Sequence, residues 1–292
     1  MIYTIENEKI RVQISDVGAE MMSLQLKEDG CEYLWQGDAT YWASRASNLF
    51  PICGRLTEGR YTCNGKTYEM QLHGFARHDL LTVVEQKTDA IAFRLVENEA
   101  SLAKYPFRFE LTIGYELDGA TVRQRFTVRN TDEQVLPFAV GGHPGYNVPL
   151  TAGECFEDYY VEFDCVRDAK KVIMSDTCFD TGRREPFALE DGKILRLRHE
   201  LFDNDAIFLT DMCKGITLKS TKGNKFVHMY YPDMNCLGFW HKPCTKAPYV
   251  CIEPWYSLPS YDGKVDDMAT KQLMIRLQPQ ETYTNAFEIT IG

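Results

Sequence analysis

Residues 107–129 read FRFELTIGYELDGATVRQRFTVR, and this stretch decides the fold. From position 107 to position 117 every second residue is apolar or aromatic, which places these side chains on one face of a β-strand. Residues 122–129 alternate in nearly the same way. Asp118 and Gly119 between the two runs form a turn signal, so we expect an antiparallel hairpin.

Short strand-like runs recur through the rest of the chain, while helical periodicity is scarce. The clearest are KIRVQI at 9–14, DYYVEF at 158–163, DAIFLTD at 205–211, GITLKS at 215–220, FVHMYY at 226–231 and TNAFEITI at 284–291. Turn-forming residues separate most of them, a pattern typical of an all-β sandwich. Because no linker, low-complexity tract or repeat interrupts the pattern, we predict a single domain over residues 1–292, built as a large antiparallel β-sandwich.

The composition and charge of the chain limit the kinds of molecule that it is expected to bind. The chain has 292 residues, 44% of them hydrophobic, and a formal net charge of −10. An acidic protein is a poor partner for nucleic acid or an anionic membrane, although a few local arginines can still hold a small anion. The N-terminal stretch MIYTIENEKI mixes charged and apolar residues, unlike a signal peptide, and no run of about 18 apolar residues suits a membrane-spanning helix. We therefore expect a cytoplasmic protein.

The motif inventory disfavours several chemistries. The ten cysteines contain no C-x-x-C pair and no zinc-ligand spacing, so we expect free thiols and no metal site. The sequence also lacks a phosphate-binding P-loop, a G-x-G-x-x-G fingerprint, H-E-x-x-H and G-x-S-x-G. NTPases, Rossmann dehydrogenases, zincins and α/β-hydrolases are therefore poor interpretations.

Glu253 is the first candidate catalytic residue, because it lies within the apolar and aromatic run YVCIEPWY at 249–256. Burial disfavours the ionised form of a carboxyl group and raises its pKa. A carboxylate with a pKa raised towards neutral suits a general base. The competing interpretation is a strand-end glutamate that points outward or pairs with an arginine.

Four other polar residues lie next to turns or strand ends. Arg55 is in LFPICGRL at 49–56, His73 in LHGFAR at 72–77, His143 in GGHPGYN at 141–147 and Asp205 in DNDAIFL at 203–209. We expect His143 on a loop that follows the strand PFAV. A solvated arginine, a surface histidine and a capping aspartate are the structural alternatives. Together with Glu253, the set suits proton transfer on a polar small molecule without a cofactor.

The same segments resemble the aldose 1-epimerases, or galactose mutarotase-like proteins, and in particular their LacX-like branch. The resemblance rests on LFPICGRLTEGRYTCNGKTYEM, LHGFAR, NTDEQVLPFAVGGHPGYNVPL, GFWHKP and YVCIEPWYSLPSYDG, which span nearly the whole chain in the family's order. It implies a supersandwich fold, a small sugar as substrate and no cofactor. It does not indicate whether the protein is a monomer or a homodimer.

The resemblance also implies roles for the candidate residues. Glu253 would take the proton of the anomeric hydroxyl while His143 protonates the ring oxygen; the opened ring then rotates and closes on its other face. For this His143 must carry a proton, which we expect a nearby carboxylate to favour. Arg55, His73 and Asp205 would hold the sugar, although Asp203 competes with Asp205 for that place. Trp240 or Phe75 would offer the sugar an apolar face.

Two alternatives stay open. The string HGFAR at 73–77 is more typical of hexose-6-phosphate 1-epimerases and LacX-like proteins, where Arg45 and Arg77 would bind the phosphate. LFPICGR is closer to the pattern of enzymes that act on free sugars, so a free aldose is the preferred substrate class. The second alternative is a carbohydrate-binding or sensing protein that uses the same fold without turnover.

Overall fold

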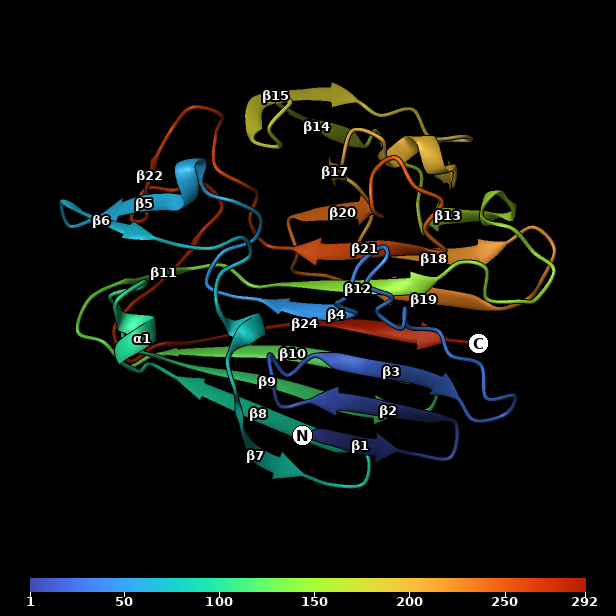
Figure 1. The fold of residues 1–292 in the computed structure, drawn as a ribbon, viewed down its shortest axis with the longest axis horizontal. Helices are drawn as coiled ribbons and strands as arrows, with labels where there is room; N and C mark the ends of the chain where they lie inside the picture. Colours follow the sequence, from blue (N-terminus) through green and yellow to red (C-terminus); the bar gives the residue numbers. More distant parts are fainter.

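Residues 1–292 are described by a computed structural model in which two large antiparallel sheets dominate (Figure 1). The nine-stranded sheet has the order β16 (Ile194–Arg196), β13 (Tyr159–Phe163), β18 (Gly215–Ser220), β19 (Phe226–Tyr230), β24 (Thr282–Ile291), β10 (Thr121–Asn130), β9 (Phe109–Asp118), β8 (Ala90–Val96) and β7 (Thr82–Gln86). The seven-stranded sheet has the order β15 (Asp180–Pro186), β14 (Lys170–Met174), β17 (Ile207–Thr210), β20 (Cys236–Trp240), β21 (Tyr249–Trp255), β12 (Gly141–Asn147) and β4 (Ala46–Leu49). The predicted all-β sandwich is confirmed.

Smaller elements complete the fold. Three minor sheets pair β1 (Ile2–Glu6), β2 (Ile10–Ser15) and β3 (Met21–Leu26); β22 (Asp266–Asp267), β5 (Arg60–Cys63) and β6 (Lys66–Glu69); and β11 (Leu136–Phe138) with β23 (Ile275–Leu277). The helical segments are α1 (Glu99–Leu102), η1 (Thr57–Gly59), η2 (Ala76–His78), η3 (Phe156–Asp158) and η4 (His199–Phe202). No helix is long and apolar enough to cross a membrane.

The hairpin predicted from residues 107–129 is formed by β9 and β10, which pair from Asp118 opposite Thr121 onward. Alternate residues of both strands are buried, as the period-two pattern predicts, in a hydrophobic core of 75 buried residues. One polar residue, Gln124, also lies on the buried face. Its side-chain amide donates a hydrogen bond to Asn48 Oδ1, which removes the cost of burying an unpaired amide.

The glycine-rich segment GGHPGYN is a strand, β12, and the prediction of a loop at His143 is wrong. The glycines are present because neighbouring side chains press against this strand. A Cβ atom at Gly142 would lie 2.6 Å from the ring of Phe287, and one at Gly141 would lie 3.0 Å from Cys53 Sγ. Glycines normally indicate a turn, but here they mark a strand that is packed too closely for side chains.

The prediction that all cysteines are free is also wrong. Cys165 and Cys213 form a disulfide, with their Cα atoms 5.8 Å apart, and the other eight cysteines are unpaired. The two residues lie 48 positions apart in the sequence. They meet because Cys165 follows β13 and Cys213 precedes β18, and these two strands are antiparallel neighbours. Sequence spacing alone does not reveal such a pairing.

Candidate active site

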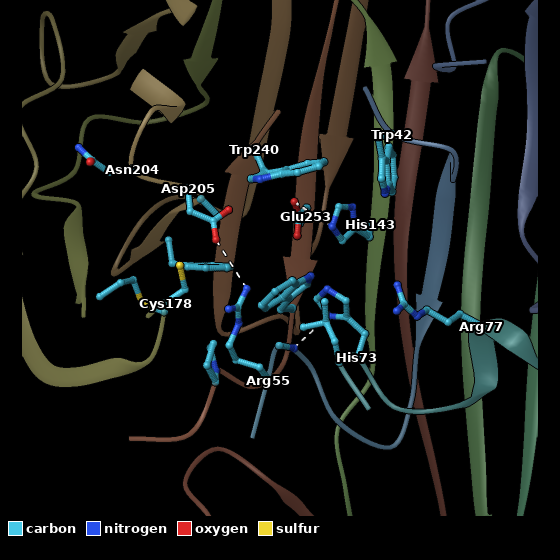
Figure 2. A pocket seen from close by; sticks show the side chains of 17 residues that line it. Trp42, Arg55, His73, Arg77, His143, Cys178, Asn204, Asp205, Trp240 and Glu253 are labelled. Atoms are coloured by element: carbon cyan, nitrogen blue, oxygen red, sulfur yellow. Dashed lines mark hydrogen bonds and ion pairs between the residues drawn. The ribbon is translucent and has the colours of Figure 1, made fainter. Parts of the chain in front are cut away.

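One cavity of about 250 Å³ contains seven of the candidate residues that the sequence singled out. It opens over the seven-stranded sheet, and Figure 2 shows the side chains that line it. Strands, turns and loops from distant parts of the chain supply these side chains: Arg55, His73, Arg77, His143, Asp205, Trp240 and Glu253. The residues therefore converge on one site, which is what a shared chemical task requires.

Glu253 and His143 form the centre of the cavity. They lie on the neighbouring strands β21 and β12, where the pairs Gly141–Trp255 and Gly145–Cys251 place His143 opposite Glu253. The distance from His143 Nε2 to Glu253 Oε1 is 3.4 Å, and the two side chains are only 10% and 1% exposed. Figure 2 shows them facing each other between Trp240 and Trp42. The pair is thus a close acid–base couple removed from bulk water.

Burial changes the protonation of both groups. It raises the pKa of Glu253 well above its ordinary range, and the nearby Asp205 carboxylate adds to this effect. It lowers the pKa of His143 to about 3, and the Arg77 cation contributes in the same direction. Both directions run against the expectation that a nearby carboxylate keeps His143 protonated, because burial disfavours the charged form of each group. They favour the neutral form of the pair, with the proton on Glu253.

This arrangement predicts an unusually broad pH profile for any activity that needs one proton on the pair. An ion pair with the ordinary pKa values of 4.5 and 6.5 would be populated mainly between those values. Here activity should be lost only as the pH falls through the lowered pKa of His143, or rises through the raised pKa of Glu253. We expect kcat/KM, corrected for the spontaneous rate at each pH, to persist as the pH falls through 4.5 and to decline only towards the lowered pKa of His143, about 3. An acid limb centred near pH 4.5, the ordinary pKa of a glutamate, would contradict the neutral pair.

His73 is held as a neutral hydrogen-bond donor. The backbone N–H of Gly54 donates to its Nδ1 at 3.0 Å, so the proton of the neutral ring lies on Nε2. Burial lowers the pKa of His73 well below its usual value and keeps the ring neutral. The following residue must be glycine: Gly74 has a φ of +76°, and a Cβ there would lie 2.1 Å from the carbonyl oxygen of Phe50.

Arg55 and Asp205 form the far side of the cavity. Arg55 Nη2 lies 3.7 Å from Asp205 Oδ2, and Arg55 Nη1 donates to the carbonyl oxygen of Thr177 at 3.3 Å. Because both side chains are partly exposed, the ion pair contributes little to stability, and its main effect is to orient the two groups. Asp203 ends η4 instead and does not line this cavity, which favours Asp205 over Asp203 as the site residue.

Buried polar atoms without partners are concentrated here. Six buried side-chain nitrogen or oxygen atoms have no hydrogen-bond partner, and four of them belong to residues that line this cavity: Arg77 Nε, His143 Nδ1, Glu253 Oε1 and Trp255 Nε1. Folded proteins leave few such groups unsatisfied, because each costs about 1–3 kcal/mol. Their clustering points to a ligand rich in polar groups.

Several cavity residues were missed by the sequence reasoning. Trp42 lies against His143 with ring centroids 4.9 Å apart and meets Trp240 edge-on at 5.7 Å. Cys178, on a loop without a motif, and Asn204, next to the predicted Asp205, also line the cavity. The alternative apolar face, Phe75, is buried in the core against Phe50 and contacts no part of the cavity.

The proposed pair of phosphate-binding arginines is not assembled. Arg77 lines the cavity and forms no ion pair. Arg45 does not line the cavity: its guanidinium donates to the carbonyl oxygen of Met22 at 2.6 Å and to Gln36 Oε1 at 3.0 Å. The cavity thus contains one arginine free to meet an anion and one, Arg55, already opposite Asp205.

Known proteins resemble this chain over its full length. The aldose 1-epimerase family matches residues 1–289. The chromosomally encoded protein LacX of Lactococcus lactis is 33% identical over 300 aligned residues, which cover 100% of this chain and 99% of LacX. A galactose mutarotase related enzyme from Lactobacillus acidophilus superimposes with a TM-score of 0.95 at 32% identity, covering 100% of this chain and 97% of that one.

A galactose mutarotase-like protein from Lactobacillus casei has the same TM-score of 0.95 at 31% identity, with both chains covered completely. Sequence and structure therefore agree over the whole length of the chain, including the strands that carry the two central residues. This protein belongs to the aldose 1-epimerase family.

Proposed function

We propose that the protein interconverts the α and β anomers of a free, non-phosphorylated aldose, with Glu253 and His143 as the proton-transfer groups. The observation that carries this proposal is the buried pair, 3.4 Å apart, in a cavity that also contains buried polar atoms without partners, Arg77 Nε and Trp255 Nε1. Anomer exchange needs one group that accepts a proton and another that donates one, and each typically contributes about 100- to 10,000-fold.

The pair can run the reaction with a single proton. In ring opening, ionised Glu253 takes the proton of the anomeric hydroxyl while protonated His143 gives a proton to the ring oxygen. This leaves protonated Glu253 and neutral His143 beside an open-chain aldehyde. In ring closure, neutral His143 takes back the proton and Glu253 returns one to the anomeric oxygen. The cycle has no net proton change.

Burial favours the neutral form of the pair, which matches the open-chain stage. The cyclic sugar must therefore draw the proton from Glu253 to His143 when it binds. Sugar hydroxyls that donate to the carboxylate favour its ionised form and would produce this shift. His73 Nε2–H, the Arg55–Asp205 pair and the ring of Trp240 are the groups that we expect to hold the sugar during the exchange.

Polarimetry on freshly dissolved α-glucose and α-galactose tests the proposal directly. The wild-type protein should accelerate the change in optical rotation of at least one of them far above the spontaneous rate. Retained sugar binding without acceleration of any aldose would instead favour a binding or sensing protein on this fold. The set of sugars tested should include glucose 6-phosphate, because one observation favours hexose 6-phosphates as a second substrate class.

That observation is the unpaired guanidinium of Arg77, which favours an anionic sugar such as a hexose 6-phosphate. We expect free aldose to prevail, because the second arginine of the clamp lies outside the cavity. The Arg77→Gln variant should leave the ratio of kcat/KM for glucose 6-phosphate to that for glucose nearly unchanged. A selective loss of about 10- to 100-fold, the value of one charged hydrogen-bonding contact, would establish the phosphate as substrate. Arg45→Gln is the matched control.

A further inference from the structure

A third metal-ligating side chain lies beside the Glu253–His143 pair. Cys251 precedes Glu253 by two residues on β21, so both side chains lie on the same face of the sheet. Donor atoms of His143, Cys251 and Glu253 all lie within 4.8 Å of one another, and all three residues are buried. The sequence spacing of positions 143, 251 and 253 matches no zinc motif. The three residues come together only because β12 and β21 pair in the sheet.

We propose that His143, Cys251 and Glu253 form a binding site for a thiophilic divalent cation such as Zn²⁺, and that the bound cation shuts off proton transfer. Imidazole nitrogen, thiolate sulfur and carboxylate oxygen are all ordinary zinc ligands, at about 2.0–2.3 Å from the metal. Such bond lengths place ligand atoms roughly 3.5 Å apart. The 3.4 Å between His143 and Glu253 already fits, and Cys251 needs a shift of about 1 Å.

The donor atoms are free to accept a metal ion. Glu253 Oε1 is buried without a hydrogen-bond partner, and so is Nδ1, the ring nitrogen of His143 on the other side from the Nε2 atom that faces Glu253. The residue opposite Cys251 on β12 is Gly145, and a Cβ atom there would lie 3.3 Å from Cys251 Sγ and 3.1 Å from Trp42. The absence of a side chain at Gly145 therefore keeps the thiol uncrowded, so that it can turn towards the pair.

Zinc binds cysteine as the thiolate and glutamate as the carboxylate, so protons held by the Cys251 thiol and the Glu253 carboxyl group pass to solvent when the ion binds.

Three protein ligands leave one position of a tetrahedral zinc ion open, and two of the three, His143 and Glu253, line the cavity. A metal ion held in this way occupies the lone pairs that anomer exchange needs. Zn²⁺ should therefore abolish the enzymatic rate and compete with sugar, and a chelator should restore the rate.

Zn²⁺ titrated at constant pH in a non-coordinating buffer tests the site, with metal affinity measured by calorimetry and inhibition by polarimetry. We expect one Zn²⁺ per wild-type chain. Binding should weaken by at least about 10- to 100-fold in Cys251→Ala and in the nearly isosteric Cys251→Ser, because loss of a mere outer-shell partner already costs that much. Each variant's inhibition is scaled to its own metal-free rate. Co²⁺ should give a thiolate-to-metal charge-transfer band in wild type that is missing from both variants.

The matched control is Cys178→Ala, which removes the unpaired thiol that lines the same cavity. It should bind Zn²⁺ like wild type. Equal Zn²⁺ affinity in wild type and both Cys251 variants, or a Co²⁺ band that persists in Cys251→Ser, would overturn the proposal. Glu253→Gln should also weaken Zn²⁺ binding by calorimetry. Because calorimetry and the Co²⁺ band need no turnover, they decide the metal site even if the protein proves inactive on every aldose.

Discussion

Replacement of Glu253 by glutamine should reduce enzymatic anomer exchange by about 100- to 10,000-fold, the usual contribution of one acid–base group. The amide cannot accept or deliver the proton that moves between the anomeric oxygen and the protein. The fold should survive, because burial already keeps Glu253 protonated and uncharged. Glutamine has nearly the same shape and charge as that neutral carboxyl group.

The measurement is polarimetry with wild type and Glu253→Gln at equal concentrations, together with a binding assay for the same sugar. Glu116→Gln is the matched control, because Glu116 is an exposed residue of β9 that pairs with Arg125. It should keep the full rate. If Glu253→Gln kept more than about a tenth of the wild-type rate, Glu253 would not be a proton-transfer group.

Replacement of His143 by glutamine should cause a loss of similar size, and the double variant should be no slower than the slower single variant. The reason is that Glu253 and His143 exchange one proton between them: once either is absent, the other has no partner in the cycle. Groups that act as a unit show this lack of additivity. His228→Gln is the control, since His228 lies on the exposed side of β19 beside Asp164.

The double-variant comparison distinguishes this mechanism from a looser one. Two groups that worked independently, each through its own water molecule, would give losses that multiply. A product of the two single losses would therefore exclude the shared-proton cycle while leaving both residues important. Melting temperatures should accompany the rates, because His143 is packed against Trp42 and its loss opens space beside that ring.

The sequence predicted the fold well for strands that bury one face in the core and expose the other. The β9–β10 hairpin alternates because one face meets the core, so its strands and turn could be derived from residues 107–129 alone. β21 is buried at every position, and its continuous apolar run makes Glu253 conspicuous. The sequence-based prediction failed at β12, where close packing favours glycine for a reason unrelated to turns.

The sequence predicted which residues form the site better than it predicted their protonation states. Residue types in a suggestive setting led to Glu253, His143 and Asp205, and all three line one cavity. Nothing in the sequence measures desolvation at a given atom, so the unprotonated state of His143 could not be derived. Trp42 was missed because a tryptophan in an irregular segment is as often core as binding surface.

The two proposed proton-transfer groups lie on adjacent inner strands of the seven-stranded sheet, whereas Asp205 and Cys178 lie on loops at its rim. Chemistry and recognition are therefore separable targets for mutation. Randomised libraries confined to residues 174–178 and 203–206 should yield variants with new sugar preferences and intact turnover. Libraries at β12 and β21 should yield mostly inactive chains, so the rim is where diversification of this scaffold can proceed.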